Sequence, residues 1–232
     1  MSRPKRSQQI QNLPEAIKDT AWKQIAEFGA PSLSLRAIAR ELGITAPSIY
    51  RYYPSRDDLV TAMIVDAFSA LAESQQATAA GASGKPLGDL LQLLGLAYRE
   101  WAVGHPQWYQ LIFGTPIPGY QAPVDITVPA AAWSLQPLIE TIEGLNAAGN
   151  LRLDDLAPQT LELKTMLEDW LRFTGGSEPE VLYLALVVWS RVHGLVSLEI
   201  GGQLPSFFSD PAEVYRREIK NIARQYLAEG SI

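Results

Sequence analysis

Apolar residues recur at three- and four-residue intervals along most of this chain, which is the spacing of amphipathic helices, and no stretch shows the alternation typical of strands. Glycines and prolines divide the helical pattern into segments. The expected helices span about 14–28, 34–42, 46–52, 55–79, 86–104, 106–113, 125–148, 155–173, 178–202 and 210–229. The pattern therefore predicts an all-α fold with about nine or ten helices.

The boundaries of the early helices are marked by residues with strong positional preferences. Ser34 is placed to cap the helix that follows it, and Gly43 is placed to end that helix in the left-handed conformation. Ser55 is expected to cap the long helix that follows it. Asp57 and Asp58 indicate the same helix start, because acidic side chains in the first turn complement the helix dipole.

Residues 33–59 contain two short predicted helices joined by a turn. Ala39, Gly43 and Ile49 lie at positions i, i+4 and i+10. A helix-turn-helix needs a small residue where its helices touch, a residue with positive φ in the turn, and a branched apolar residue under the second helix. The spacing indicates such a motif, although an ordinary helical hairpin is the alternative on spacing alone.

Composition indicates a soluble globular protein. Of the 232 residues 47% are apolar and 19% are charged, and there is no cysteine, which excludes disulfides and thiolate chemistry. No uninterrupted apolar run approaches the ~18 residues of a membrane span, and the polar N-terminus does not resemble a signal peptide. We expect a cytoplasmic protein that neither spans a membrane nor requires a cofactor.

The charge is divided unevenly along the chain. Residues 1–56 contain nine Lys and Arg against four Asp and Glu, whereas residues 57–232 contain ten against 21. The net charge is therefore +5 on the first segment and −11 on the second, and −6 overall. A basic segment on an acidic remainder suits a protein whose N-terminal part binds a polyanion.

The end of the motif resembles a known signature. Tyr50, Tyr52, Tyr53, Arg56 and Leu59, together with the turn 43–45, match the pattern that follows the helix-turn-helix in the TetR family of bacterial repressors. The chain departs from it at Tyr52, where histidine is commonest, and at Arg56, where lysine is commonest. The resemblance implies a three-helix DNA-binding head carrying the helix-turn-helix, on a helical body for ligand binding and dimerisation.

The resemblance also implies roles for residues of the head. Ala46, Pro47 and Ser48 would lead the recognition helix into the major groove, while hydroxyls and guanidinium groups would contact phosphates or a guanine edge. The candidate DNA contacts are Ser34, Arg36, Thr45, Ala46, Pro47, Ser48, Tyr50, Arg51, Tyr52 and Arg56. The basic tail with Arg3, Lys5 and Arg6 could add a contact or remain solvated.

A second resemblance concerns the C-terminal part. His105-Pro106 and the Trp189, His193 and Gly194 pattern are similar to the regulatory domain named after a Trp-His-Gly motif in this family. Such domains bind varied effectors in mostly apolar cavities. The candidate ligand-binding residues are Trp101, His105, Trp108, Phe113, Trp133, Trp170, Trp189 and His193, although aromatic residues at helical spacing also form ordinary cores.

The last two predicted helices suit a dimer interface. Helix 178–202 is apolar nearly all round and so needs cover on both sides, and helix 210–229 carries an apolar stripe. In the family, the last two long helices of one subunit pack against the same two helices of a second subunit. The candidate interface residues are Val188, Leu195, Tyr215, Ile219, Ile222 and Tyr226, and a monomer with a central core helix is the alternative.

These observations predict a DNA-binding domain over residues 1–55 and a ligand-binding and dimerisation domain over 56–232. The expected function is that of a transcriptional regulator, acting as a repressor: a homodimer that binds a palindromic double-stranded operator under the control of a small, mostly apolar effector. A helical interaction or signalling protein without DNA binding is one alternative.

An enzyme is the other alternative, and the sequence disfavours it. There is no Gly-x-Ser-x-Gly motif for a serine nucleophile, and Gly84-Lys85 is followed by Pro86 where a phosphate-binding loop needs serine or threonine. A zinc site would have to be built from two distant histidines without cysteine. We therefore expect no catalytic residues and no bound metal.

Overall fold

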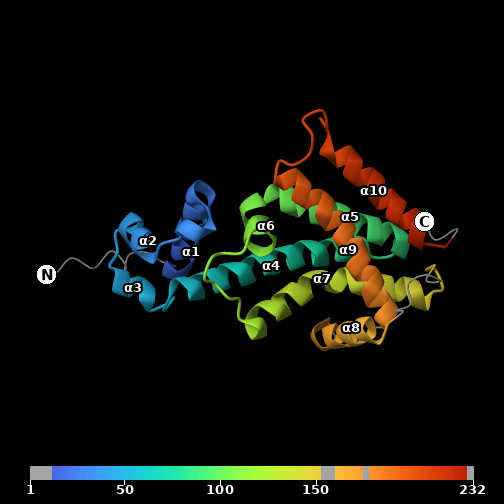
Figure 1. The fold of residues 1–232 in the computed structure, drawn as a ribbon, viewed down its shortest axis with the longest axis horizontal. Coiled ribbons are helices and arrows are strands. Elements are labelled where there is room, and N and C mark those ends of the chain that lie inside the picture. Colours follow the sequence, from blue (N-terminus) through green and yellow to red (C-terminus); the bar gives the residue numbers. More distant parts are fainter. Residues whose placement is uncertain (1–11, 153–159, 175–177, 229–232) are drawn as a thin grey trace. The chain divides into compact units, whose positions relative to one another are not determined.

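The fold is helical throughout the part of the chain that the structure describes. This structure is a computed structural model, and it describes residues 12–152, 160–174 and 178–228 (Figure 1). These residues form ten α-helices: α1 (Leu13–Phe28), α2 (Leu35–Leu42), α3 (Ala46–Tyr50), α4 (Arg56–Gly81), α5 (Leu87–Gly104), α6 (Pro106–Phe113), α7 (Val124–Ala147), α8 (Leu161–Thr174), α9 (Pro179–Ile200) and α10 (Pro211–Tyr226). The prediction of an all-α fold is confirmed.

Two compact units make up the chain. The first, here called the head, consists of the residues up to Ala67 together with Gln107–Thr127, and the second, the body, consists of Phe68–Pro106 and the residues from Val128 onward. The described residues 12–55 fall within the first unit, which also takes in residues 56–67 and 107–127, predicted above to belong to the second domain. The domain boundary between residues 55 and 56 stays a prediction.

The apolar face of α1 forms the centre of the head. Ile17 and Ala21 are fully buried and Ile25 is nearly so, because α1 packs against α2 and the short 3-10 turn Ala30–Ser32. The side chain of Phe28, by contrast, is 61% exposed. It is the last residue of α1, where the chain turns away at Gly29.

The predicted caps of the head are confirmed. The Ser34 hydroxyl accepts a hydrogen bond from the backbone N–H of Ala37 at 3.4 Å, and Gly43 ends α2 with a φ of 65°. At the start of α4, the backbone N–H of Asp58 donates to the Ser55 hydroxyl at 3.1 Å. The Asp58 carboxylate accepts from the Ser55 N–H at 2.8 Å, so these two residues form a reciprocal capping box.

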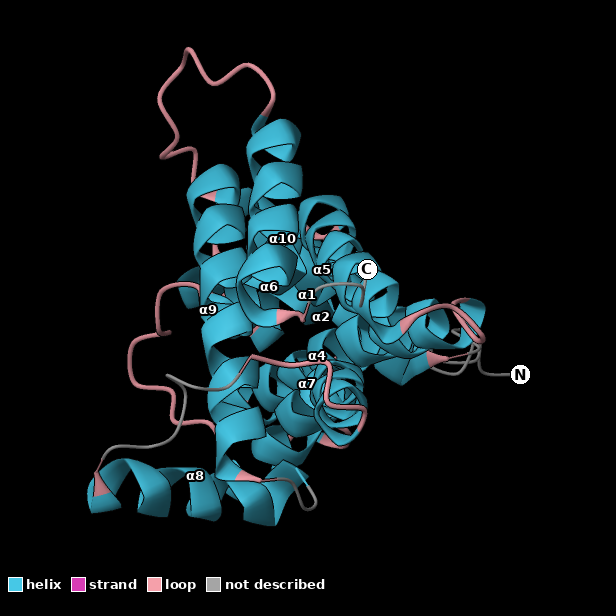
Figure 2. Ribbon diagram, turned by 90° about the vertical axis from the view of Figure 1, so that its right-hand side faces the viewer, coloured by secondary structure: helices cyan, strands magenta, loops and turns pink. Residues whose placement is uncertain are grey.

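In the body, α4 lies between α5 and α7 in both ribbon views (Figures 1 and 2). The helix α9 packs against α5, α8 and α10, and α10 packs in turn on α5. The only strand-like pairing among the described residues is a single antiparallel bridge between Leu151 and Leu227, which joins the segment after α7 to the end of α10. The rest of the cohesion comes from helix packing.

By length and composition alone, α9 is apolar enough to cross a membrane. One face explains much of this composition, because Val181, Leu182, Leu184, Val192 and Val196 are buried within the body. A core helix of a water-soluble protein has the same composition, so this finding is weak evidence for a membrane span.

Candidate nucleic-acid interface

The second helix of the motif presents a small, mixed surface. Thr45 and Pro47 are exposed at the start of α3, and Ala46 and Ser48 are half-buried. The hydroxyls of Thr45 and Ser48 lie 2.9 Å apart and share a hydrogen bond. Ile49 is only 1% exposed, as expected for the residue under this helix. The outer side of α3 therefore carries short groups that can approach a base edge closely.

Larger polar groups surround this surface. Tyr50 and Tyr52 are 42% and 43% exposed, and Arg51 between them and Arg36 on α2 are exposed. Ser34 uses its oxygen to cap α2, but its hydroxyl hydrogen can still be donated. These phenol, hydroxyl and guanidinium groups are the donors that phosphate oxygens accept from.

Arg56 lies differently from what the sequence suggested. Its Nη2 donates to the backbone carbonyls of Ala30 and Pro31, at 3.4 and 3.3 Å. Its Nε is buried and has no hydrogen-bond partner among the described residues. The guanidinium thus links the start of α4 to the turn before α2, which is an intramolecular role. A phosphate contact by Arg56 stays a prediction.

A half-buried ammonium group, which no sequence pattern indicated, joins α1 to α4. The Lys18 Nζ contacts Asp66 at 2.6 Å and Glu15 at 2.8 Å, and the Lys18 side chain is 13% exposed. Burial opposes the charge, but the hydrogen bonds to both carboxylates outweigh it and raise the pKa of Lys18 above its ordinary value. Asp66 is 48 residues away in sequence, so no local pattern could have indicated this pair.

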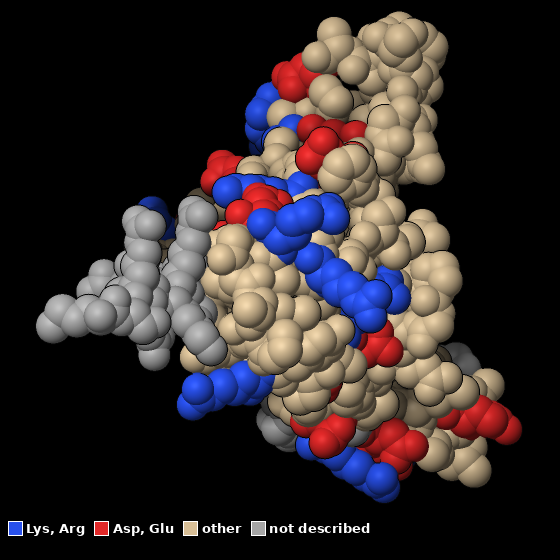
Figure 3. All heavy atoms as spheres, turned by 90° about the vertical axis from the view of Figure 1, so that its left-hand side faces the viewer, with Lys and Arg blue, Asp and Glu red and all other residues tan. Residues whose placement is uncertain are grey.

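Figure 3 shows a diagonal band of Lys and Arg side chains on one face, with Asp and Glu side chains beside it. Within the head, Lys23, Arg36, Arg40 and Arg51 are exposed. The described residues 12–56 hold six Lys and Arg against four Asp and Glu, so they carry +2 of the net charge of +5 that residues 1–56 have in sequence. The tail with Arg3, Lys5 and Arg6 lies outside the described residues.

The eight aromatic and histidine residues proposed as a ligand pocket do not share one unit. Trp108 and Phe113 belong to the head, where Trp108 stacks on Trp22 and Phe113 contacts Tyr109. The other six, Trp101, His105, Trp133, Trp170, Trp189 and His193, belong to the body. The residues that were expected to form one cluster are therefore divided between the head and the body, because α6 lies almost wholly in the head.

The two histidines differ in their surroundings. His105 is exposed, and its Nδ1 lies 2.9 Å from the backbone carbonyl of Trp101 at the end of α5. His193 is half-buried, with its Nδ1 2.9 Å from the Tyr98 hydroxyl and its Nε2 3.3 Å from the Ser197 hydroxyl. Burial lowers the pKa of His193, which favours a neutral imidazole that bridges α5 and α9.

The remaining aromatic candidates of the body range from buried to exposed. Trp101 is 6% exposed, and its buried indole Nε1 finds no hydrogen-bond partner in the part of the chain that the structure describes. Trp189 packs on His193 with ring centroids 4.9 Å apart. Trp170 is half-buried on α8, and Trp133 is 38% exposed. Trp101 and the group around His193 are thus the strongest candidates for a ligand contact.

Five of the six predicted dimer-contact residues are buried inside their own chain. Val188, Tyr215, Ile219, Ile222 and Tyr226 are each at most 8% exposed. The Tyr215 hydroxyl donates to the carbonyl of Gly95 at 2.6 Å, which shows that the stripe on α10 faces α5. The subunit itself covers these five side chains, and their assignment to a dimer interface stays a prediction.

Leu195, the sixth, lies on an open surface. It lines a groove of about 940 Å³ between α9 and α10, whose walls also include the apolar side chains of Leu198 and Val214. Arg191 links the two helices that line this groove, because its Nε donates to Glu218 at 2.7 Å and its Nη1 to Gln225 at 2.8 Å. The surface available for a partner is therefore the groove rather than the α10 stripe.

No group of three or more His, Asp or Glu side chains is placed to hold a metal ion in the described part of the chain.

Comparisons with known proteins agree on one family. Residues 17–63 match the family model described as bacterial regulatory proteins of the tetR family, and residues 91–222 match that of tetracyclin repressor-like C-terminal domains. The HTH-type transcriptional regulator Rv1816 of Mycobacterium tuberculosis is 34% identical over 214 residues, which cover 91% of each chain.

Solved structures extend the same comparison. The crystal structure of a regulatory protein, SCO4313, is 36% identical, covers 96% of this chain and 98% of its own, and superposes with a TM-score of 0.74. The TetR family transcriptional regulator PfmR from Thermus thermophilus is 12% identical, covers 90% and 97%, and has a TM-score of 0.59, which shows a shared fold.

Proposed function

This chain belongs to the tetR family of bacterial regulatory proteins, and on that premise we propose that it is a repressor whose operator affinity is controlled by a small effector. It is a transcriptional regulator and not an enzyme. In our proposal it works in the cytoplasm as a homodimer on a palindromic DNA site, with no cofactor.

One observation carries the proposal: α3 exposes short side chains over a buried Ile49, directly after a left-handed Gly43. This is the geometry in which a recognition helix enters the major groove with its first turn. Ser48 and Arg36 are the candidates for base contacts, and Tyr50 and Tyr52 are the candidates for phosphate contacts.

Selection of bound duplexes from a random DNA library tests this function. We expect a palindromic sequence whose half-site centres lie about one helical turn apart, ~34–36 Å. Affinity for it should fall steeply with salt, because each neutralised phosphate releases counterions. Equal, salt-insensitive affinity for every duplex would refute specific DNA binding and favour a helical interaction protein instead.

Variants separate the two kinds of contact. Tyr50→Ala should weaken binding to all duplexes alike, whereas Arg36→Ala should change the base preference at particular positions, by ~1–3 kcal/mol for a good contact. Arg172→Ala on α8 is a matched control, because Arg172 is an exposed arginine of the body. Among the described residues, its ion pair is with Asp169, which is also on the surface. It should leave both properties unchanged.

The proposed homodimer uses the groove between α9 and α10. A charge placed there is desolvated when a partner covers it, so Leu195→Glu or Val214→Glu should weaken dimerisation and, with it, operator affinity. Val103→Glu is the control, since Val103 is 42% exposed on α5, away from this groove. Sedimentation gives the dimer dissociation constants. A dimer insensitive to both groove charges would place the interface elsewhere.

This use of α9 accounts for its apolar composition without a membrane. Arg191 is paired with Glu218, and His193 is hydrogen-bonded to Tyr98, so the helix carries polar groups within its length that are satisfied by α5 and α10. A buried or subunit-facing helix with such pairs is stable in a water-soluble dimer, whereas polar groups in lipid are costly.

For the effector we propose a mostly apolar small molecule that contacts Trp101 and Trp189, with His193 as the polar group. A ligand changes operator affinity only through its different affinities for two states of the protein, and a tenfold change needs ~1.4 kcal/mol. Titration of lipophilic compounds should therefore change tryptophan fluorescence and operator occupancy together. An unchanged response in Trp101→Phe and Trp189→Phe variants would exclude these residues as the lining.

A further inference from the structure

The hydrogen bonds of Arg56 close a loop of the chain that contains the proposed DNA-reading surface. Its Nη2 reaches the carbonyl of Pro31, which lies 25 residues earlier in the sequence. Between these two residues lie α2, the turn 43–45, α3 and the link 51–55 that leads into α4. The candidate DNA contacts from Ser34 to Tyr52 are therefore all within this loop.

The two bends of the loop are themselves fixed by backbone hydrogen bonds. In the turn after α2, the N–H of Ile44 donates to the carbonyl of Ala39 at 3.0 Å. In the link after α3, the N–H groups of Tyr52 and Tyr53 both donate to the carbonyl of Ile49, at 2.8 and 3.0 Å. The path of the chain from α2 to α4 is thus held at each bend, and Arg56 ties the start of α4 back to the start of α2.

A side chain of α1 holds the same corner from another direction. Gln24 is 8% exposed, and its Oε1 accepts a hydrogen bond from the backbone N–H of Ser34 at 3.4 Å. Ser34 is the residue that caps α2. The segment that leads into α2 is therefore held by two polar side chains from separate helices, Gln24 of α1 and Arg56 of α4.

These polar contacts supply what apolar packing at the start of α2 does not. Leu33, Leu35 and Ile38 are buried and fix how deeply α2 sits in the head, but hydrophobic burial has no directional preference. Hydrogen bonds depend on distance and angle, so they orient the first turn of the helix. That turn carries Arg36, and a side chain that reads a base edge must be placed to within about 0.5 Å.

The burial of Arg56 is not favourable for stability alone. Its Nε has no hydrogen-bond partner among residues 12–152, 160–174 and 178–228, and a buried donor without a partner costs free energy. Departures from full hydrogen bonding are concentrated at functional sites. The position of this guanidinium therefore indicates a role beyond stability.

We propose that Arg56 and Gln24 are positioning residues of the DNA-reading surface, which hold Ser34 and Arg36 in register with the first turn of α3. This inference rests on the proposed binding of a specific DNA site, and it gives Arg56 a role other than contact with a phosphate. Loss of the guanidinium should then weaken recognition of the sequence without removing a neutralised phosphate.

Two duplexes separate these roles: the site recovered by selection from the random library, and a scrambled duplex of the same length and composition. In Arg56→Gln the side-chain amide is too short to reach the two carbonyls. We expect the affinity for the recovered site to fall on the order of tenfold, the cost of about one good base contact. Affinity for the scrambled duplex should equal that of the control Arg40→Gln, which removes the same charge from an exposed position on α2.

A second variant tests the positioning role without a change of charge. Gln24→Met keeps the approximate volume of the side chain but removes the oxygen that accepts from Ser34. It should lower discrimination, the ratio of the two affinities, while the salt dependence of binding stays that of the wild type. If Arg56→Gln does not fold, this variant alone decides the test.

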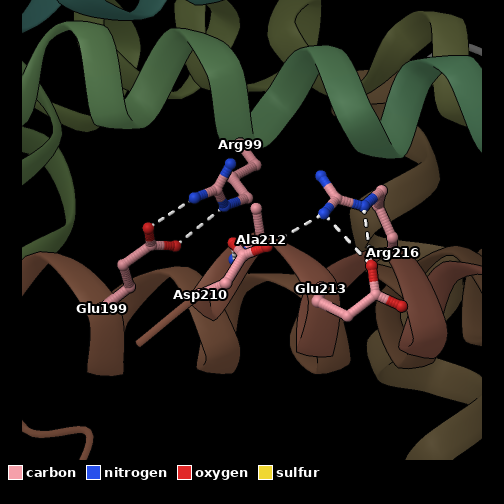
Figure 4. Close-up of polar contacts among 6 residues, drawn as sticks. All are labelled: Arg99, Glu199, Asp210, Ala212, Glu213 and Arg216. Atoms are coloured by element: carbon pink, nitrogen blue, oxygen red, sulfur yellow. Dashed lines mark hydrogen bonds and ion pairs between the residues drawn. The ribbon is translucent and has the colours of Figure 1, made fainter. Parts of the chain in front are cut away.

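Arg99→Gln is the control for a loss of stability. Arg99 also joins two elements, because its Nε donates to Glu199 of α9 at 2.8 Å (Figure 4), but both residues lie in the body. This variant should lower the temperature of thermal unfolding and leave discrimination unchanged at concentrations where it sediments as the wild type does. A purely structural role of Arg56 would give the same pattern.

The outcomes distinguish the positioning role from specific DNA binding itself. Wild-type discrimination in a folded Arg56→Gln or Gln24→Met protein overturns the role of that residue and leaves specific binding intact. Equal losses on both duplexes in Arg56→Gln, with the slope of log K against log salt reduced by about 0.9, overturn it in favour of a phosphate contact. A wild-type protein that binds both duplexes equally refutes specific DNA binding and, with it, the positioning role.

Discussion

Trp22 of α1 and Trp108 of α6 stack on each other in the head, with ring centroids 4.9 Å apart and ring planes 12° from parallel. The stack joins the first helix of the DNA-binding motif to a segment that follows it by more than eighty residues in sequence. A second contact supports the same arrangement, since the hydroxyls of Thr61 on α4 and Tyr120 in the loop after α6 lie 2.9 Å apart. The head is therefore more than its first three helices.

A double-mutant cycle measures how strongly this stack stabilises the head. We expect Trp22→Leu and Trp108→Leu each to lower the free energy of unfolding, and their coupling energy to be about 0.5–1.5 kcal/mol, as for other aromatic pairs. Urea denaturation of the four proteins gives the cycle. Trp133→Leu takes the place of Trp108→Leu in the control cycle, because Trp133 lies in the body. Its effect on the free energy of unfolding should simply add to that of Trp22→Leu. Strict additivity between Trp22 and Trp108 would contradict the contact.

Gly43 is the turn residue whose replacement should be most harmful to the motif. With a φ of 65° it occupies a conformation that costs an L-residue about 1–2 kcal/mol. We therefore expect Gly43→Ala to lower the stability of the head by about that amount and to reduce operator affinity. Gly104→Ala is the matched control, because Gly104 is helical and an added Cβ meets nothing within 4 Å. Thermal unfolding and gel-shift titration of both variants decide the comparison.

Local signals in the sequence predicted the parts of this structure that depend on neighbouring residues. Ser34, Gly43 and Ser55 mark helix ends because their own backbone and side-chain chemistry favours those positions, and each acts as expected. The buried position of Ile49 followed in the same way from its place in the motif.

Long-range packing could not be predicted from the same signals. An apolar stripe shows that a helix face is covered, but not whether the subunit or its partner covers it, so Tyr215 and Ile222 were assigned to an interface although α5 lies over that stripe. Trp108 was grouped with the ligand candidates by its spacing, and its partner Trp22 lies in a distant helix. Lys18 and Asp66 were missed for the same reason.

Close approach between α5 and α10 depends on Gly95. A Cβ at this position would collide with the Cδ1 atom of Ile219. Overpacking costs about 1–3 kcal/mol in other cores, and alanine offsets roughly 1 kcal/mol of this because it favours a helix interior over glycine, so we expect Gly95→Ala to lower the stability by about 1 kcal/mol. The compensating variant is Ile219→Val, which removes Cδ1 itself, so the double variant should recover most of the loss in urea denaturation. A double variant as unstable as the sum of the two single ones would show that another neighbour limits the approach.

His193 gives the body a specific dependence on pH. Its pKa is lowered from the ordinary value of 6.5 by burial, so the unfolded chain takes up a proton at a pH where the folded chain does not. The stability contributed by the neutral imidazole is therefore complete above about pH 6.5 and is lost as the pH falls below that value toward the folded-state pKa. The groups that hold the ring, the Tyr98 and Ser197 hydroxyls and the face of Trp189, are all uncharged in this range.

The measurement compares two proteins that share a common background, because the chain has only two histidines. His105→Asn removes the exposed one, and His105→Asn with His193→Asn removes both while keeping a polar group near the Tyr98 hydroxyl. Urea denaturation between about pH 5.5 and 7.5 should show a larger loss of stability on acidification in the single variant, since carboxylates titrate equally in both. Identical pH dependence in the two proteins would mean that the His193 ring is hydrated in the folded chain and that its bridge between α5 and α9 contributes no proton-linked stability.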